Sequence, residues 1–332
     1  MLPPLDSLSI LKDRYKVIGI IGQGGMGSIY KAEDTRLEGR TCAIKEIQID
    51  VNASPTQQQQ AREQFYREAT VLARLDHPNL PKVSDFFDEQ DRDFLVMDYI
   101  PGIDLRQRIE EQRSNHSFIP EKELLNWAEQ LCDALTYLHH QEPPVVHRDI
   151  KPANIKLTPD GRIKLVDFGL VKIMTPDDTR TITVIQGRGT VLYTPLEQYG
   201  GDVGHTDPRT DLYSLGATLY HLATNEPPLE AKERFLHPGA LRRPRQINPE
   251  LSNQTEKAIM WAMGMHPDDR PGSVEEWLSM LHGTGDVYAL PRSNDRIAFD
   301  RINWVLGLGV FALLTLAVLI TLVQQFGLPG LQ

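Results

Sequence analysis

The spacing of apolar residues changes along this 332-residue chain from a strand pattern to a helix pattern. Residues 15–50 contain short runs of β-branched and aromatic residues separated by glycine-rich turns, which is typical of strands. From residue 121 onward, apolar residues recur at helical spacing. A strand-rich first part followed by a helical second part predicts an α+β protein with two lobes. The predicted helices cover roughly residues 121–140, 210–223, 252–263 and 273–282.

A further helix and a strand pair are expected between these two parts. Apolar residues recur at helical spacing from Phe65 to Leu75. This helix should stop before Pro78, because a proline disfavours helical backbone in the residue before it. Residues 52–60, which end in four glutamines, are predicted to form a polar loop. The strand pair is expected over residues 83–87 and 94–99.

A glycine-rich turn joins the first two predicted strands. Residues 22–27 read Gly-Gln-Gly-Gly-Met-Gly, and a further strand begins near Ile29. Glycines let backbone amides approach phosphate oxygens because no side chain stands in the way. A dinucleotide-binding motif of similar pattern opens a helix, so the strand that follows here favours a loop lying over a nucleotide. A flexible hairpin with no ligand is the alternative.

Lys45 lies one strand later, among apolar neighbours. Burial of an unpaired ammonium group is costly, so this lysine needs an acidic partner. Glu68 is the natural candidate, because it shares a helix face with Phe65 and Leu72. An ion pair between the two would aim the ammonium group at phosphates. The alternatives are a solvent-facing lysine on an edge strand and a plain surface carboxylate.

The run His147-Arg148-Asp149-Ile150-Lys151-Pro152-Ala153-Asn154 is followed, 13 residues beyond Asn154, by Asp167-Phe168-Gly169. These residues resemble the eukaryotic-type protein kinases, whose catalytic loop reads HRDxxxxN and whose magnesium motif is DFG. The opening GxGGMGxxY is similar to that of the bacterial membrane-anchored serine/threonine kinases. The resemblance covers roughly residues 12–282 and implies a bilobal protein kinase fold.

The resemblance implies a role for each residue of these motifs. Phosphoryl transfer needs positioned phosphates, metal ions that neutralise charge, and an oriented hydroxyl nucleophile. Asp149 would orient the substrate hydroxyl and accept its proton, and Asn154 and Asp167 would hold Mg²⁺. Lys45 would hold the α- and β-phosphates of ATP. Lys151 resembles the lysine that contacts the γ-phosphate in serine/threonine kinases, which favours that specificity over tyrosine.

Residues 95–100 resemble the hinge between the lobes of a kinase. Met97 would be the gatekeeper, and the backbones of Asp98 and Ile100 would form hydrogen bonds with adenine. An ordinary strand between the lobes is the alternative. The expected ATP-binding residues are Gly22, Gln23, Gly24, Gly25, Met26, Gly27, Ile29, Ala43, Lys45, Met97, Asp98 and Ile100.

Three further residues resemble structural positions of the family. Asp211 resembles the aspartate that braces the catalytic loop, and Arg270 resembles the arginine that pairs with the glutamate of an APE motif. That glutamate is Glu197, but here the site reads Pro-Leu-Glu, with the proline one position early. This departure concerns substrate docking and does not imply inactivity.

A second departure concerns Lys156, which stands where the family commonly places an apolar residue beneath adenine. Its aliphatic stem could cover the ring while the ammonium group reaches water. If the ammonium group instead points at the base, the affinity for ATP suffers.

The segment from residue 167 to residue 197 resembles an activation loop. Arg148 precedes the catalytic aspartate, which is the usual mark of kinases switched by phosphorylation of this loop. A phosphothreonine adds about −1.5 to −2 charges that can pair with arginine. We therefore expect autophosphorylation at Thr181 or Thr183, for which two copies of the chain could meet as a homodimer. Loop threonines without a role are the alternative.

Residues 302–323 form a run of 22 residues without a charge. As a helix this run would be roughly 33 Å long, enough to cross the hydrocarbon core of a bilayer. Arg292, Arg296 and Arg301 precede it, and no lysine or arginine follows it. The positive-inside rule then places the preceding residues in the cytoplasm. A buried helix that ends the globular domain is the alternative.

The sequence as a whole predicts an ATP- and Mg²⁺-dependent serine/threonine protein kinase that is a single-pass membrane protein. The alternatives are a membrane-anchored pseudokinase scaffold and, with less support, a small-molecule phosphotransferase. A net charge of −10 argues against a nucleic-acid partner. The expected regions are a leader over 1–14, a kinase domain over 15–282 with lobes over about 15–97 and 101–282, a linker over 283–301, a membrane helix over 302–323 and a tail over 324–332.

Overall fold

The computed structural model describes residues 3–24, 27–47, 54–90, 92–167, 172–173, 190–199 and 207–283, all within one compact unit that spans residues 1–286. The predicted membrane helix over 302–323 lies outside the described residues, and so do Gly25, Met26, Thr181 and Thr183. Within the described ranges, every helix is too short or too polar to cross a membrane.

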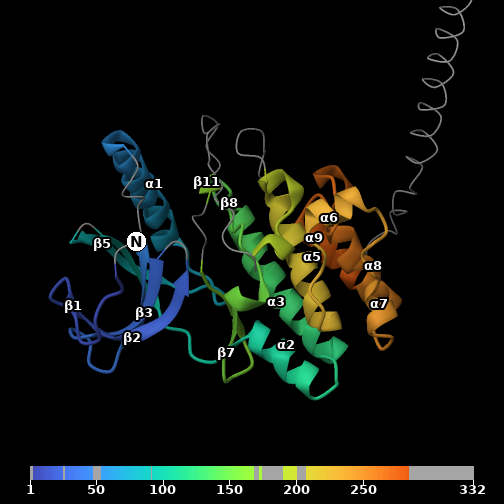
Figure 1. Ribbon diagram of the computed structural model, residues 1–332, viewed down its shortest axis with the longest axis horizontal. Helices are drawn as coiled ribbons and strands as arrows, with labels where there is room; N and C mark the ends of the chain where they lie inside the picture. Colours follow the sequence, from blue (N-terminus) through green and yellow to red (C-terminus); the bar gives the residue numbers. More distant parts are fainter. Residues whose placement is uncertain are drawn as a thin grey trace, which may run out of the picture. The chain divides into compact units, whose positions relative to one another are not determined.

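An antiparallel sheet of six strands forms the N-terminal lobe, in the spatial order β1-β2-β3-β4-β6-β5 (Figure 1). Side chains on β3 alternate between buried and partly exposed, as expected for a strand with one face on a core. Tyr30, Ile44, Phe94 and Val96 are fully buried on that inner face. The strands are β1 (Ile10–Leu11), β2 (Tyr15–Gly24), β3 (Gly27–Asp34), β4 (Thr41–Ile47), β5 (Val83–Glu89) and β6 (Arg92–Asp98).

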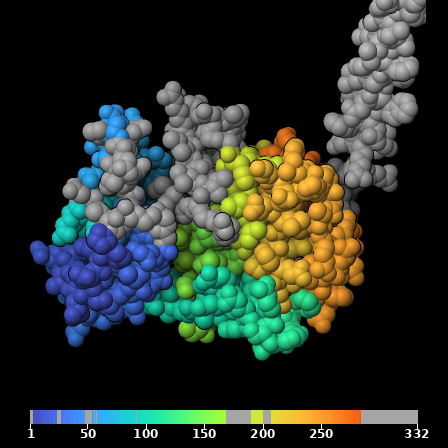
Figure 2. Space-filling view, viewed as in Figure 1, coloured from blue at the N-terminus to red at the C-terminus, as the bar shows by residue number. Residues whose placement is uncertain are grey.

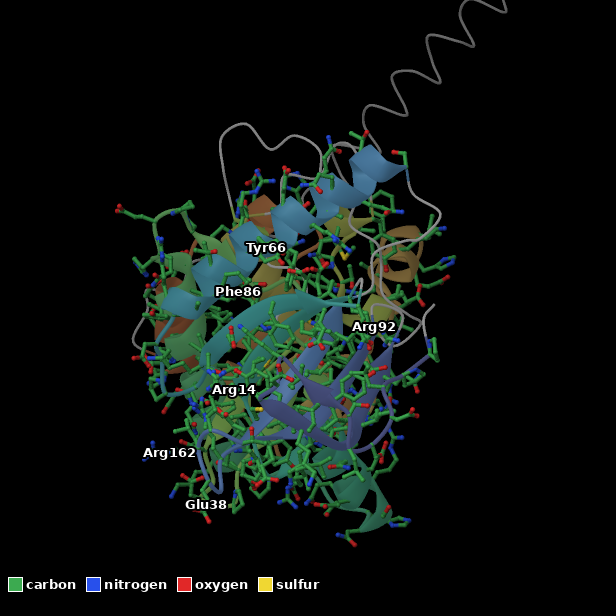
Figure 3. All side chains as sticks on the ribbon, turned by 90° about the vertical axis from the view of Figure 1, so that its left-hand side faces the viewer. Arg14, Glu38, Tyr66, Phe86, Arg92 and Arg162 are labelled. Atoms are coloured by element: carbon green, nitrogen blue, oxygen red, sulfur yellow. The ribbon has the colours of Figure 1, made fainter. Side chains whose placement is uncertain are left out.

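One long helix, α1 (Pro55–Arg74), packs on β5 of this lobe. The ring of Tyr66 on α1 meets the ring of Phe86 on β5 edge to face, with centroids 5.6 Å apart (Figure 3). The prediction of a polar loop through residue 60 is wrong, because the helix begins at Pro55. Proline suits the first position of a helix, where its missing N–H is not needed, and glutamine is a good helix former.

Helices build the C-terminal lobe around α5, whose residues from Thr210 to Thr224 are all buried. A helix that is buried all round lies in the middle of a core. Gly216 lets α5 approach α8 closely, since a Cβ there would come within 2.8 Å of Ala262. The helices are α2 (Leu105–Ser114), α3 (Glu121–His139), α5 (Pro208–Thr224), α6 (Ala231–Leu236), α7 (Pro244–Ile247), α8 (Asn253–Ala262) and α9 (Val274–Leu281).

Short strands and single turns of 3₁₀ helix lie between these helices along the chain. β9 pairs with both β7 and β10, and β11 pairs with β8. Figure 2 shows the blue N-terminal lobe beside the green-to-orange C-terminal lobe, which confirms the predicted bilobal α+β fold. These elements are β7 (Ile103–Asp104), β8 (Val145–Val146), β9 (Ile155–Leu157), β10 (Ile163–Leu165), β11 (Lys172–Ile173), η1 (Pro152–Asn154), η2 (Val191–Tyr193), η3 (Leu196–Gln198) and η4 (Pro267–Asp269).

Candidate active site

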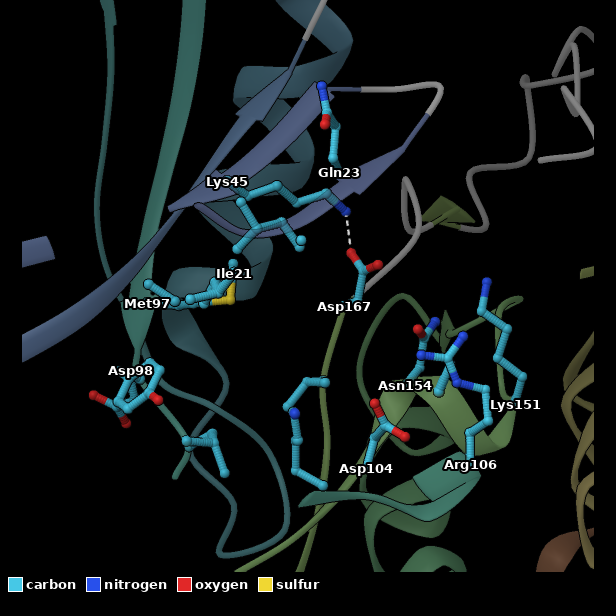
Figure 4. Close-up of a pocket in the computed structure, with 18 of the residues that line it drawn as sticks. Ile21, Gln23, Lys45, Met97, Asp98, Asp104, Arg106, Lys151, Asn154 and Asp167 are labelled. Atoms are coloured by element: carbon cyan, nitrogen blue, oxygen red, sulfur yellow. Dashed lines mark hydrogen bonds and ion pairs between the residues drawn. The ribbon is translucent and has the colours of Figure 1, made fainter. Parts of the chain in front are cut away.

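A cavity of about 740 Å³ is lined by residues of both lobes (Figure 4). Its volume lies in the range of small-molecule binding sites. The strand register explains part of the lining, because Ala43 on β4 lies opposite Met97 on β6, and Ile29 on β3 lies opposite Lys45. The predicted ATP-binding residues that line it are Gly22, Gln23, Gly27, Ile29, Ala43, Lys45, Met97, Asp98 and Ile100.

Gly24 ends β2. Gly27 begins β3 with φ +134°, a conformation that side chains rarely adopt. A Cβ at Gly27 would overlap the carbonyl oxygen of Glu46. The backbone geometry of this hairpin therefore requires glycine at position 27.

Lys45 reaches across the cavity and forms an ion pair with Asp167 (Figure 4). Burial alone would raise the pKa of the Asp167 carboxyl, but the Lys45 ammonium outweighs burial and holds that pKa below its usual range. Glu68 on α1 is buried and accepts a hydrogen bond of 3.0 Å from Gln64 Nε2. The Lys45–Glu68 ion pair stays a prediction.

The Asp149 carboxylate is held by Lys151 and Asn154, two residues that line the cavity. Lys151 Nζ donates to both carboxylate oxygens, at 2.9 and 2.8 Å, and Asn154 Nδ2 donates to Oδ2 at 2.9 Å. Lys151 Nζ also donates to Thr190 Oγ1 at 2.9 Å, so that Lys151 bridges Thr190 and Asp149. Asp149 is only 7% exposed, which leaves little room for its side chain to move.

The donor set at Asn154 and Asp167 fits a magnesium ion. The amide nitrogen of Asn154 is turned toward Asp149, so its side-chain oxygen is left for other contacts. Mg²⁺ prefers oxygen ligands and commonly takes one or two protein groups together with phosphate and water. Among the described residues no group of three or more His, Cys, Asp or Glu side chains could hold a metal by itself. Phosphate and water oxygens could complete the coordination of a metal held by these two side chains.

Asp211, at the start of α5, holds the backbone of the segment that carries Asp149. Its fully buried carboxylate accepts the amides of His147 and Arg148, both at 2.8 Å, and the His139 Nε2 at 2.9 Å. Burial raises the pKa of Asp211, but the His139 hydrogen bond and nearby positive charge outweigh burial and lower it. Arg148 has φ +67°, which costs energy and persists because these hydrogen bonds fix it.

The segment over residues 190–199 is fixed to the same helical lobe. The predicted ion pair between Glu197 and Arg270 is present, with Nη2 and Oε2 2.9 Å apart. Tyr193 is buried, and its hydroxyl lies 2.7 Å from His221 Nδ1 on α5. Nothing in the sequence pattern marked His221 or His139, because a single histidine on a helix carries no motif.

A family model described as "Protein kinase domain" matches residues 15–280. The chain belongs to the eukaryotic-type serine/threonine protein kinase family. The solved kinase domain of PknI from Mycobacterium tuberculosis is 27% identical, with a TM-score of 0.64 over 85% of this chain and 100% of that one. The resemblance seen in the sequence and the bilobal fold therefore agree.

Curated kinases are similar over most of this chain. A probable serine/threonine-protein kinase of Streptomyces coelicolor is 35% identical over 281 residues, which are 80% of this chain and 39% of that protein. Serine/threonine-protein kinase C of Synechocystis sp. is 34% identical over 285 residues, which are 83% of this chain and 51% of that protein. The chain thus spans about two fifths to half the length of these relatives.

The cavity of this kinase also contains residues that the sequence did not single out for the site. Ile21 reaches the cavity from β2, and Val166 reaches it from the position directly after β10. Arg106 reaches it from α2. Lys156 lines it as well. Asp104 lies beside Lys156, because β7 and β9 pair these two residues.

Proposed function

We propose that this kinase transfers the γ-phosphate of ATP to serine and threonine hydroxyls of proteins, with Mg²⁺ as cofactor. The observation that supports this most is that Lys45, Lys151, Asn154 and Asp167 line one cavity, and that two of them, Lys151 and Asn154, hold the carboxylate of Asp149. A pseudokinase scaffold would tolerate the loss of at least one of these side chains. Every one of them is present, so catalysis is the better-supported function.

The arrangement suggests what each side chain does. Lys45 carries the positive charge that would hold the α- and β-phosphates, and its contact with Asp167 ties the two lobes together at the reacting end. Asn154 and Lys151 fix the orientation of the Asp149 carboxylate, so that it can accept the proton of a substrate hydroxyl. Bound Mg²⁺, held by Asn154 and Asp167, would neutralise phosphate charge as transfer proceeds.

Two proposals concern regulation and location. We propose autophosphorylation at Thr181 or Thr183, with a homodimer as the arrangement in which one copy phosphorylates another. The supporting features are the loop threonines and Arg148 next to the catalytic aspartate. We also propose that residues 302–323 anchor the chain in a membrane, with the kinase domain on the cytoplasmic side.

Transfer can be tested by incubating the full chain in detergent with radiolabelled ATP, Mg²⁺ and a generic protein substrate. Label on the substrate is expected for the natural chain and not for Asp149→Asn or Asp167→Ala. Asp149→Asn keeps the volume of the side chain, and Asp167→Ala removes only the carboxylate. Lys45→Met should bind ATP more weakly and lose transfer. ATP binding without any transfer by the natural chain would favour the scaffold. Mapped phosphate at Thr181 or Thr183 would support the regulatory proposal.

The membrane anchor needs its own measurement. In a membrane fractionation with alkaline washing, the full chain should stay with the membranes and a variant that lacks residues 302–323 should be released. If both are released by the wash, the anchor is ruled out.

A further inference from the structure

Arg106 is an arginine at the reacting end of the cavity. It is the second residue of α2, and its side chain is exposed. Its guanidinium group points up from α2 into the cavity, toward Asn154 and Lys151 (Figure 4). Because Lys151 contacts Asp149, the Arg106 side chain faces the place where a substrate hydroxyl would meet the γ-phosphate.

The guanidinium group of Arg106 has no ion pair or hydrogen bond with any residue that the structure describes. Other arginines of the same helix are engaged. Arg108 pairs with Glu111 at 3.3 Å and with Glu123 at 3.5 Å, and Arg113 donates to the Asn225 carbonyl. The free positive charge therefore distinguishes Arg106 within α2.

The position of Arg106 is unfavourable for the helix itself. The N-terminus of a helix carries partial positive charge, which favours acidic residues there and opposes a cation. The first turn of α2 contains no acidic residue. The preceding Asp104 is engaged in the helix cap, where its carboxylate accepts the Gln107 amide at 2.9 Å. The cap thus uses the Asp104 carboxylate for the helix end, and the guanidinium group of Arg106 is the positive charge that is left to attract an anion from outside the helix.

The segment over residues 190–199 lies within electrostatic reach of Arg106. Burial raises the pKa of the Tyr193 phenol, and the positive charge of Arg106 acts against that rise. Thr190 of the same segment lines the cavity together with Arg106. A hydroxyl that receives phosphate beside Asp149 must enter at this end, so the residues that flank it in a protein substrate pass close to Arg106.

We infer that Arg106 binds an anionic side chain close to the phosphoacceptor hydroxyl, so that the kinase selects acidic protein substrates. The flat guanidinium fork can bind a carboxylate or a phosphate through two parallel hydrogen bonds. The anion is therefore the side chain of aspartate or glutamate, or a phosphoserine left by an earlier phosphorylation. This inference rests on the proposed protein kinase activity.

The test measures kcat/KM of the full chain for a set of serine peptides. Each peptide carries glutamate, glutamine, lysine or phosphoserine at one position beside the acceptor, and the position is moved stepwise to either side. We expect about a tenfold preference for glutamate over glutamine at one or two positions, as for a hydrogen bond between charged groups. The ratio of kcat/KM for glutamate peptides to that for glutamine peptides should fall to near one in Arg106→Ala and recover partly in Arg106→Lys. In Arg106→Glu, lysine peptides should have a higher kcat/KM than glutamate peptides.

Arg108→Ala is the matched control, because it removes an arginine of the same helix that does not line the cavity. It should keep the preference for glutamate. A stronger preference for phosphoserine than for glutamate would identify a phosphorylated substrate as the source of the anion.

Three outcomes would overturn the inference. An equal rate for all peptides rejects the role of Arg106 and leaves the kinase activity standing. A raised KM for ATP in Arg106→Ala, with the glutamate preference unchanged, would assign the arginine to the nucleotide. The absence of transfer to every peptide, with ATP still bound, rejects the proposed function and this inference together.

Discussion

Arg270 and Glu197, 73 residues apart in the sequence, form an ion pair in which every N–H of the guanidinium group has an acceptor. Nη1 and Nη2 donate to the two oxygens of Glu197, at 2.5 and 2.9 Å. The remaining donors reach the carbonyl oxygens of Gly264, Arg209 and Met265, at 2.8 to 3.1 Å. The pair thus joins the segment over residues 190–199 to the region between α8 and α9.

Replacing Arg270 should destabilise the fold strongly. Arg270→Lys keeps the charge but loses the fork, so it leaves buried carbonyls and part of Glu197 without donors. We expect the free energy of unfolding to fall by about 2–4 kcal/mol in denaturant titrations. The control is Arg242→Lys, at an exposed pair with Glu226 of 3.3 Å, which should cost less than about 1 kcal/mol. Equal losses in the two variants would contradict a structural role for Arg270.

Gly27→Ala should weaken ATP binding. The new Cβ would collide with the Glu46 carbonyl, in a backbone conformation that costs a side chain about 1–3 kcal/mol. The hairpin over the cavity would have to shift, so the Kd for ATP should rise about tenfold, measured by calorimetry. Gly19→Ala in the neighbouring strand β2, where nothing lies within 4 Å, should bind ATP as the natural chain does. An unchanged Kd in Gly27→Ala would show that the hairpin does not contact the nucleotide.

His221 should make the fold less stable in mild acid. Burial lowers the pKa of His221 to about 4, and the charge of Arg113 adds to the effect. The unfolded chain binds this proton near pH 6.5, so it holds more protons than the folded chain between pH 6.5 and about 4. The free energy of unfolding should therefore fall as the pH falls through this window, by up to about 3 kcal/mol. Above pH 6.5 the imidazole is neutral in both states and contributes no pH dependence.

The measurement is the free energy of unfolding as a function of pH for His221→Gln. Glutamine can still bond the Tyr193 hydroxyl but cannot take up a proton, so the slope below pH 6.5 should be smaller. His237→Gln removes an exposed histidine and should leave the slope unchanged. If the two variants have the same slope as the natural chain, the acid sensitivity comes from other groups.

Lys156→Met should tighten the binding of ATP. Lys156 lines the cavity opposite Asp104 in the β7–β9 register. An ammonium group beside an adenine ring must give up part of its hydration, whereas methionine keeps a similar apolar volume at no such cost. Calorimetry should show a Kd that is severalfold lower. A higher Kd would mean that the ammonium group makes a favourable contact with the nucleotide.

The sequence by itself predicted the charged residues that the motifs bring to the candidate site, and the order in which strands and helices follow. Strands, turns and long helices were predicted where local patterns are strong, as in β4 and α3. The helix start at Pro55 was missed, because polar glutamines carry no apolar period although they favour helix. α2 was missed as well, since it is short and mostly polar.

Only the tertiary structure decided which side chains meet. It paired Lys45 with Asp167, assigned the hydrogen-bond acceptors of Arg270, and brought His221 to Tyr193. It also placed Arg106 at the cavity with no ion pair to any of the residues that the structure describes. The physical reason is that local patterns depend on neighbours a few residues apart, whereas these contacts join residues tens of positions apart. Such contacts exist only after the core has packed and fixed the distances between the elements.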